Sequence, residues 1–264
     1  MFVYAAVVGS TVHTLDVAAV SVAEPLGGGR PRLLATSLQT YVTVDEELEP
    51  RAHGLAVEPC SRWPGEERLY RLHLDWLSQR RRLLPQARAE AGRAGEPLPA
   101  SGVVSGLHVV SPEDTFIHPS VIDAAKLFYL IDQVAAVAAI RSIEGPAVTA
   151  GFDEAFFVHP ARLGDIVVVE AGLTGAGRTS LEALVRVTVE RPSLGERRVM
   201  ARMYATLVSV DAEGRPAPPR RRPETPPGEA GGYRERRRRR LERRRRAEEM
   251  AEALLGLLRS RGLA

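Results

Sequence analysis

One acidic residue, Asp132, stands in the middle of a long apolar stretch of the chain. Residues 121–141 read VIDAAKLFYLIDQVAAVAAIR, and their spacing predicts a helix that is apolar on most sides. A helix of that kind is usually buried, and burying an unpaired charge is costly. Three explanations are therefore open: a structural acid satisfied by a partner, an acid at a solvent-exposed edge, or a carboxylate that takes part in chemistry.

A second candidate for chemistry is the short segment GAGRTS at residues 175–180. A guanidinium can bind a phosphate group through two hydrogen bonds, so Arg178 could pair with a phosphate while Thr179 and Ser180 add hydroxyl groups. The alternative is a plain hairpin, in which the glycines supply turn geometry and Arg178 is merely exposed. The sequence has no cluster of His and Cys residues at metal-ligand spacing, so we expect no metal site.

The elements that must position these residues can be identified from an internal repeat. Residues 3–50 align with residues 169–216 at a constant offset of 166 and without a gap. Both copies predict three alternating strands, with a Gly-containing turn after the first. Identical pairs include Gly9/Gly175, Leu15/Leu181, Glu24/Glu190, Ala35/Ala201, Thr40/Thr206 and Asp45/Asp211.

The two copies differ in what precedes them. The second copy follows residues 107–166, which contain the helix with Asp132, whereas the first copy has no such segment. Met1 aligns with Val167, inside a strand, so we expect the upstream coding region to supply the missing strand, helix and strand. The first copy is therefore predicted to be half a unit.

The repeat divides the chain into four parts. We assign residues 1–55 to the C-terminal half of a first unit and residues 56–100 to a basic helix and linker. Residues 101–218 form a complete unit, and residues 219–264 form a Pro-rich linker with an Arg-rich C-terminal helix.

The segment SPEDTFIHPSVIDAAKLFYLID at residues 111–132 resembles the signature of the cytosolic acyl-CoA hydrolases, which are hotdog-fold thioesterases. The residues that match are Pro112, Asp114, Thr115, Leu127, Leu130, Ile131 and Asp132. Further matches follow at Phe157, Pro160, Gly164, Asp165, Gly177 to Ser180 and Glu182. The resemblance implies an α+β hotdog fold, in which an antiparallel sheet wraps around a central helix, here with one complete unit plus a half unit.

The resemblance also implies roles for individual residues in hydrolysis of acyl-CoA to a fatty acid and coenzyme A. Asp132 is implied to be the catalytic carboxylate, as a general base on water or a nucleophile on the thioester carbonyl. Backbone N–H groups at the helix start, at Ala124 and Ala125, would polarise the thioester oxygen. His118 is a candidate polar group near that oxygen. Thr115, together with Arg178, Thr179 and Ser180, would bind the substrate, and no cofactor is implied beyond coenzyme A as part of that substrate.

Three positions depart from the family signature. Phe116 stands where the family has Asn, Ala124 and Ala125 replace a Gly-Gly pair, and Asp123 is inserted before them. The alanines add methyl groups close to the substrate, and Asp123 places negative charge beside a developing oxyanion. An alternative therefore stays open: a catalytically impaired acyl-CoA-binding or structural hotdog subunit.

Helix geometry predicts that one chain cannot complete this site. Ala124 and Asp132 are eight residues apart, so their backbones lie about 12 Å apart within one helix. One thioester carbonyl cannot reach both, because each needs hydrogen-bond distance. We therefore expect the acid and the oxyanion donor to come from two helices, in a homodimer or larger assembly.

The C-terminal segment GGYRERRRRRLERRRRAEEMAEALLGLLRSRG carries the highest charge density in the chain. We interpret it as a solvated helix with internal Glu–Arg pairs, whose leucines indicate docking on protein. Attraction of coenzyme A phosphates and RNA binding are the alternatives. The segment has no interleaved aromatic residues to stack on bases, so nucleic acid is not the expected partner.

The remaining sequence features concern the cellular compartment in which the protein is found. The single cysteine, Cys60, excludes an internal disulfide framework and fits a reducing cytoplasm. The N-terminus lacks the basic region of a signal peptide, and no apolar run approaches the roughly 20 residues of a membrane span. We therefore expect a cytoplasmic protein.

Overall fold

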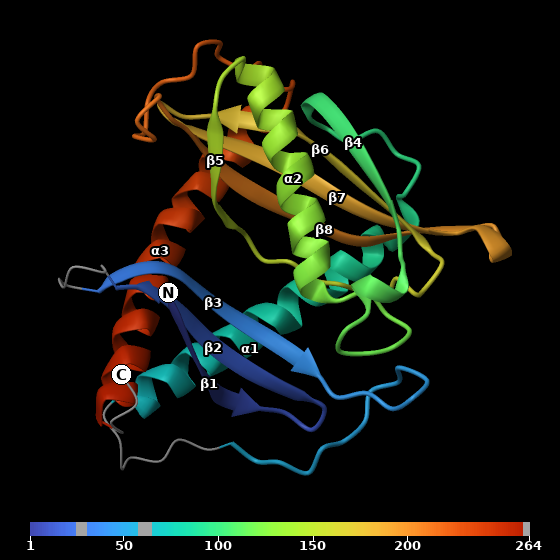
Figure 1. Cartoon of the computed structure of the whole chain (residues 1–264), viewed down its shortest axis with the longest axis vertical. Helices are drawn as coiled ribbons and strands as arrows, with labels where there is room; N and C mark the ends of the chain where they lie inside the picture. Colours follow the sequence, from blue (N-terminus) through green and yellow to red (C-terminus); the bar gives the residue numbers. More distant parts are fainter. Residues whose placement is uncertain (25–30, 58–64, 261–264) are drawn as a thin grey trace. The chain divides into compact units, whose positions relative to one another are not determined.

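A computed structural model describes residues 1–24, 31–57 and 65–260 of the chain (Figure 1). It divides into two compact units. The first unit comprises Met1–Arg82 and Arg239–Ala264, and the second comprises Leu83–Arg238. The first unit is thus built from both ends of the chain, and the second from its middle.

The second unit is a five-stranded antiparallel sheet with one long helix on its face (Figure 1). The strands follow the order β4-β6-β7-β8-β5. Their bounds are β4 Ser101–Val109, β5 Ala147–Phe152, β6 Ile166–Ala176, β7 Ser180–Arg191 and β8 Glu196–Ser209. The helix, α2, spans Ala124–Ile143. The predicted α+β plan, a sheet wrapped around a central helix, is confirmed.

Alternation along the strands explains which side of the sheet holds α2. In β7, Leu181, Ala183, Val185 and Val187 are fully buried and face the core that contains α2. From the helix, Ile131, Ala135, Ala138 and Ala139 enter the same core. The small alanines let the helix lie close to the sheet, and each large side chain buried there stabilises the fold by about 1.5–3 kcal/mol.

The sequence predicted a helix from Val121 to Arg141 that is buried on most sides, and α2 differs in two ways. It begins three residues later, because the N–H groups of Ile122 and Asp123 donate to the carbonyls of Ala161 and Asp114, at 3.0 and 2.8 Å. It is also covered by the sheet on one side only. Tyr129, Val137 and Ile140 are 42–58% exposed on the other side. We call these three residues the α2 stripe.

The first unit contains the smaller antiparallel sheet β1-β2-β3, formed by Phe2–Ser10, Thr14–Ala23 and Arg32–Val42. Its backbone repeats that of β6-β7-β8 position by position. A bulge between Val7 and Gly9 matches one between Leu173 and Gly175, and the bridge Val44–Pro50 matches the bridge Val210–Pro216. The predicted offset of 166 therefore holds for strand register as well as for sequence.

One face of the first unit's sheet is covered by two helices. Val20 and Val22 pack in one cluster with Leu69 of α1 (Glu66–Ala89) and with Leu254 and Leu257 of α3 (Glu229–Ser260). None of the described helices is both long and apolar enough to cross a membrane.

On the opposite face of the same sheet, side chains are exposed to solvent among the described residues. Val3, Val7 and Tyr41, which correspond through the repeat to core residues of the complete unit, are 47–60% exposed. This is the face that α2 covers in the second unit.

Candidate functional site

The turn that leads into α2 is held by a buried acid, Asp114, at the end of the short 3₁₀ helix Pro112–Asp114. Its Oδ2 accepts hydrogen bonds from the N–H and Oγ of Ser111, at 2.8 and 2.9 Å, and lies 2.7 Å from Nε2 of His108. Lys126 Nζ lies 3.1 Å from Oδ1 as an ion pair, outside good hydrogen-bond geometry. Asp114 thus joins β4, the turn and the first turn of α2.

The protonation of Asp114 follows from these contacts. Burial acts to raise its pKa. The hydrogen bonds from Ser111 and the contacts with His108 and Lys126 outweigh burial, and hold the pKa of the Asp114 carboxyl well below its usual range. The group is therefore charged at neutral pH, and Lys126 is the matching cation beside the start of α2.

Asp123, the N-cap residue of α2, faces the preceding loop. Its carboxylate accepts the backbone N–H groups of Phe116 and Ile117, at 2.9 and 3.1 Å, and makes no cap hydrogen bond to the helix. Ala124 and Ala125 are exposed at the helix start. The carboxylate thus leaves the first N–H groups of α2 without a side-chain cap. Two backbone N–H groups of the loop stabilise its negative charge instead.

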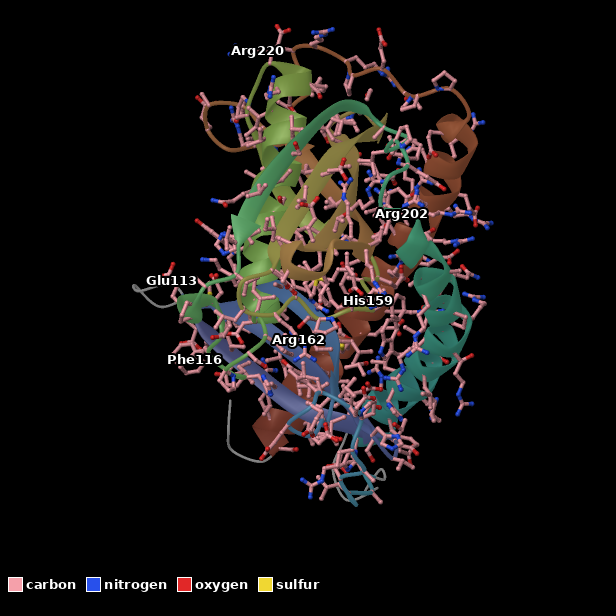
Figure 2. All side chains as sticks on the ribbon, turned by 90° about the vertical axis from the view of Figure 1, so that its right-hand side faces the viewer. Glu113, Phe116, His159, Arg162, Arg202 and Arg220 are labelled. Atoms are coloured by element: carbon pink, nitrogen blue, oxygen red, sulfur yellow. The ribbon has the colours of Figure 1, made fainter. Side chains whose placement is uncertain are left out.

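Phe116 projects from that loop into solvent and is 92% exposed (Figure 2). The neighbouring candidates make local contacts instead. Thr115 Oγ1 donates to the carbonyl of Pro112 at 2.9 Å, and His118 Nδ1 lies 3.1 Å from Ser120 Oγ. Both are partly buried, so the loop before α2 is an ordered platform with an exposed aromatic tip.

Asp132 lies eight residues into the same helix and is partly exposed beside the α2 stripe. Its neighbours Tyr129 and Gln133 are joined by a 3.0 Å hydrogen bond from Gln133 Nε2 to the phenol oxygen. Among the described residues, Asp132 itself has no hydrogen-bond partner. Of the three explanations considered from the sequence, a partner-satisfied structural acid is therefore not supported by the part of the chain that the structure describes.

Arg178 and Thr179 lie in the turn of the hairpin between β6 and β7, and Ser180 is the first residue of β7. The Gly177 N–H donates to the carbonyl of Ser180 at 2.7 Å, and the Ser209 N–H donates to that of Thr179 at 2.8 Å. Arg178 is exposed. Strand β6 begins near the loop before α2 and is 11 residues long, so the hairpin lies roughly 33 Å along the strand from that loop. The structure therefore does not bring Arg178 together with Ala124 and Ala125 within one chain.

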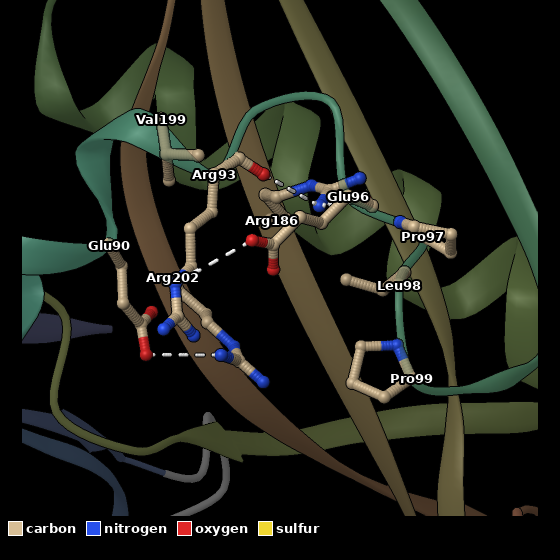
Figure 3. Close-up of a pocket in the computed structure, with 9 residues that line it drawn as sticks. All are labelled: Glu90, Arg93, Glu96, Pro97, Leu98, Pro99, Arg186, Val199 and Arg202. Atoms are coloured by element: carbon tan, nitrogen blue, oxygen red, sulfur yellow. Dashed lines mark hydrogen bonds and ion pairs between the residues drawn. The ribbon is translucent and has the colours of Figure 1, made fainter.

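A hollow of about 310 Å³ lies on the other face of β7 and β8, beneath residues 90–99 (Figure 3). Arg186 is buried there, pairs with Glu170 at 2.8 Å and donates to the carbonyl of Glu96. Arg202 pairs with Glu90 at 3.1 Å. Because these guanidinium groups have partners from the protein itself, the cluster fastens the linker to the sheet, and we assign no ligand to it.

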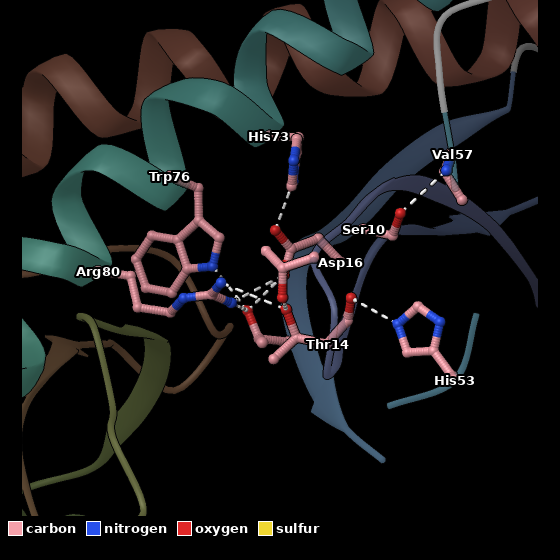
Figure 4. Close-up of polar contacts among 10 residues, drawn as sticks. Ser10, Thr14, Asp16, His53, Val57, His73, Trp76 and Arg80 are labelled. Atoms are coloured by element: carbon pink, nitrogen blue, oxygen red, sulfur yellow. Dashed lines mark hydrogen bonds and ion pairs between the residues drawn. The ribbon is translucent and has the colours of Figure 1, made fainter. Parts of the chain in front are cut away.

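A second buried acid, Asp16, occupies the middle strand of the first unit (Figure 4). It lies 2.6 Å from His73 Nδ1 and 3.2 Å from Arg80, and accepts a 2.6 Å hydrogen bond from Thr40. The repeat places Glu182 at the same position in the second unit, where Arg236 of α3 contacts it at 2.8 Å. In both units this acid anchors a helix that follows the repeat, so its role is structural.

Comparison with known proteins identifies the family to which the chain is similar. A family model described as the thioesterase superfamily matches residues 124–196, from the start of α2 to the start of β8. The chain is 37% identical over 117 residues to an uncharacterized acyl-CoA thioester hydrolase, YkhA, of Bacillus subtilis, covering 44% of this chain and 67% of that protein. It is 30% identical over 122 residues to the cytosolic acyl coenzyme A thioester hydrolase of Rattus norvegicus, covering 45% of this chain and 32% of the rat protein.

Two solved structures of acyl-CoA hydrolases are also similar to this chain. An acyl-CoA hydrolase of Staphylococcus aureus, solved with butyryl coenzyme A, coenzyme A and coenzyme A disulfide, matches with a TM-score of 0.51 and 28% identity, over 58% of this chain and 95% of that one. An acyl-CoA hydrolase of Bacillus cereus matches with a TM-score of 0.50 and 33% identity, over 58% and 94%.

The match to the thioesterase superfamily, together with a sheet wrapped around α2, assigns the second unit to the hotdog class of thioesterases. Within that class, the chain belongs to the acyl-CoA thioester hydrolase family. It spans about two thirds of the length of the Bacillus subtilis relative and about one third of the rat relative.

Proposed function

We propose that this protein hydrolyses acyl-CoA thioesters to a carboxylic acid and free coenzyme A, with Asp132 as the catalytic carboxylate. The observation that carries the proposal is a partly exposed carboxylate on the central helix of a thioesterase fold, without a hydrogen-bond partner among the described residues. As a general base, Asp132 takes a proton from water while the oxygen attacks the carbonyl carbon. The carbon–sulfur bond then breaks, and the coenzyme A thiolate recovers the proton.

The carbonyl oxygen needs donors where negative charge develops, and the uncapped N–H groups at Ala124 and Ala125 supply them. These groups and Asp132 are about 12 Å apart on one helix, too far to act on one carbonyl. The donor and the acid for one reaction therefore come from two chains, in a homo-oligomer. The α2 stripe, an exposed apolar row beside Asp132, is the surface on which the second helix packs.

Substrate contacts are proposed at two places. At the loop before α2, Thr115 and His118 lie next to the uncapped helix end and contact the acyl-thioester portion. Arg178, Thr179 and Ser180 bind a phosphate of coenzyme A. The separation of roughly 33 Å along β6 assigns these two groups to different bound substrates, or to different chains around one substrate. The cytoplasm is the proposed site of action, supported by the single Cys60 and by the cytosolic relatives.

Thiol release from acetyl-, butyryl- and palmitoyl-CoA, followed with a thiol-reactive chromophore, tests the function directly. We expect turnover of at least one substrate well above the uncatalysed rate. An absence of thiol release from all three, with a folded and assembled protein, would contradict hydrolysis.

A second function, acyl-CoA binding without turnover, is favoured by one observation. Phe116 stands, 92% exposed, where the family resemblance places Asn, so this position lacks the polar side chain of the family signature. Calorimetric titration with coenzyme A separates the two functions. Binding without thiol release identifies the binding subunit, whereas binding with release identifies the enzyme.

A further inference from the structure

Helix α3 carries the densest charge in the protein. Ten of the thirteen residues 234–246 are arginines, and the other three are Glu235, Leu241 and Glu242. Like charges spaced three and four residues apart destabilise a helix. The positions of these arginines on the helix therefore bear on what α3 does.

The inner side of α3 is already occupied. Arg236 pairs with Glu182 and Glu229, each at 2.8 Å, and lies 4.1 Å from the centre of the Tyr204 ring. Further along, Leu254 and Leu257 are buried in the core of the first unit. These contacts fix which side of the helix faces the protein.

The outer side of α3 is a row of exposed arginines, which we call the α3 basic stripe: Arg234, Arg237, Arg238, Arg244 and Arg245. Their spacing of three, four and seven residues keeps them on one side of a helix. The stripe spans 11 residue steps, about 16 Å, so it presents about one positive charge per 3–4 Å. One strand of a nucleic-acid duplex carries one phosphate per about 3.4 Å.

Two of the ion pairs that the stripe makes within the protein are exposed to solvent. Arg238 lies 3.0 Å from Glu235, and Arg244 lies 3.1 Å from Glu248, with the arginine side chains 70% and 77% exposed. Exposed pairs of this kind contribute little to stability. A phosphate can therefore replace either glutamate at small cost.

We propose that the α3 basic stripe binds the phosphate backbone of a nucleic-acid strand without preference for base sequence. An anionic membrane fits less well, because a helix lying on a membrane needs an exposed apolar side. Leu241 is the one large apolar side chain exposed on α3 among the described residues. Base reading is not expected either, because Tyr233, the aromatic residue of α3, is buried.

The test is fluorescence anisotropy with a labelled 20-nucleotide oligouridine, measured from 50 to 200 mM salt with the full chain. Five phosphate contacts to a single strand predict a log–log salt slope of about −3.5, a loss of affinity of roughly 100-fold over this range. Replacing all five stripe arginines by glutamine should weaken binding by at least tenfold at 50 mM salt and flatten the slope.

The matched control removes five exposed arginines from another helix, α1: Arg68, Arg71, Arg81, Arg82 and Arg88, each to glutamine. This control has the same net charge as the stripe variant and should keep most of the affinity. Equal losses in both variants would overturn the proposal, since net charge alone would then explain binding.

Two further measurements distinguish other partners. Binding to phosphatidylserine vesicles in the absence of oligouridine binding would replace the proposal with a membrane partner. An increased KM for acyl-CoA in the stripe variant, without any oligouridine binding by the parent protein, would mean that the stripe attracts coenzyme A phosphates instead. An unchanged KM and kcat in the stripe variant, with lost RNA binding, supports a site separate from the proposed thioesterase site.

Discussion

Asp132 combines two properties that a carboxylate within an apolar helix seldom has. It is partly exposed, and it has no hydrogen-bond partner among the described residues. Replacement of a structural acid would be expected to destabilise the protein, because the hydrogen-bond partners of the acid would be left unsatisfied. A catalytic acid without partners can be replaced with little change in stability, since nothing in the fold depends on it.

Asp132→Asn should therefore lower kcat for thioester hydrolysis by about 100-fold or more while leaving the melting temperature nearly unchanged. Steady-state thiol release and thermal unfolding monitored by circular dichroism measure the two effects. Gln133→Ala, on the next position of α2, is the control and should keep near-normal turnover. A variant at Asp132 with normal kcat would remove the residue from the mechanism.

Asp114 is the opposite case, a carboxylate that the fold depends on. Its side chain is fully buried between His108, Ser111 and Lys126. Asp114→Asn leaves Lys126 without its anion and removes the charged acceptor beside Ser111 and His108, so it should lower the free energy of unfolding at pH 7 by about 3 kcal/mol. Urea denaturation of the two proteins measures this difference.

The pH dependence of that difference has a defined direction. Because the pKa of folded Asp114 is lowered, its charge stabilises the fold fully above the ordinary pKa of an aspartate, and the contribution is lost as pH falls toward the folded value. The gap between wild type and Asp114→Asn should thus be constant from pH 7 to 5 and shrink below about pH 4. A gap that widens on acidification would contradict this assignment.

At the scale of elements, sequence reasoning was accurate wherever local pattern decides the outcome. The repeat predicted three strands with a turn after the first in both copies, because both carry the same alternation and the same turn residues, and the structure adds that their register and bulges agree as well. The position of α2 was predicted to within three residues. The exposed α2 stripe was not predicted, because an apolar side chain does not reveal whether its own sheet or a second molecule covers it.

Contacts between distant segments could not be predicted from the sequence either. Asp114 was recognised as a signature residue, but its partners His108 and Lys126 are brought to it by the turn. Arg178 shows the converse: the motif was visible, whereas its distance from α2 depends on the length and direction of β6. Whether the predicted site residues act together stays a prediction.

The α2 stripe makes the composite site testable. Val137→Glu places a charge on an exposed apolar position, so it should not unfold the second unit, but it should dissociate the proposed oligomer and reduce hydrolysis at least tenfold. Light scattering and thiol release follow both outcomes. Leu194→Glu, at another exposed apolar position, after β7, is the control and should change neither. A fully active monomer of Val137→Glu would refute the shared site.

Mixing two inactive variants is a second test of whether the donor and the acid come from different chains. Asp132→Ala removes the acid, and Ala124→Trp blocks the uncapped helix start. If donor and acid come from different chains, the mixture should recover part of the activity. No recovery after exchange of subunits would place both groups in one chain.

At the scale of the whole molecule, the first unit depends on both ends of the chain. Its sheet shares a core with Leu254 and Leu257 of α3, whereas the core of the second unit is formed by residues 110–207. Trp76 of α1 donates its indole N–H to Thr40 Oγ1 of β3 at 2.8 Å, within the first unit. The fluorescence of Trp76 therefore reports on the first unit.

Leu254→Ala should destabilise the first unit by about 2–5 kcal/mol, because the residue is fully buried and its loss leaves a cavity. The fluorescence transition in urea should shift to lower concentration. Leu207→Ala, equally buried in the second unit, is the matched control and should leave the fluorescence transition in place while shifting one detected by circular dichroism. Equal shifts in both signals for both variants would mean that the two units unfold as one.

The discontinuous first unit also sets an order for folding during synthesis. Leu69 and Leu254 are neighbours in one core but 185 positions apart in the chain, which corresponds to roughly 10–40 s of translation at 5–20 residues per second. During that interval β1, β2 and β3 have emerged from the ribosome, whereas the helix that completes their core has not. All residues of the second unit are synthesised before that helix is complete. Until residues 254–257 have been synthesised, Val20 and Val22 of β2 lack the α3 side chains that complete their core, so the first unit cannot finish folding before the second unit has been made.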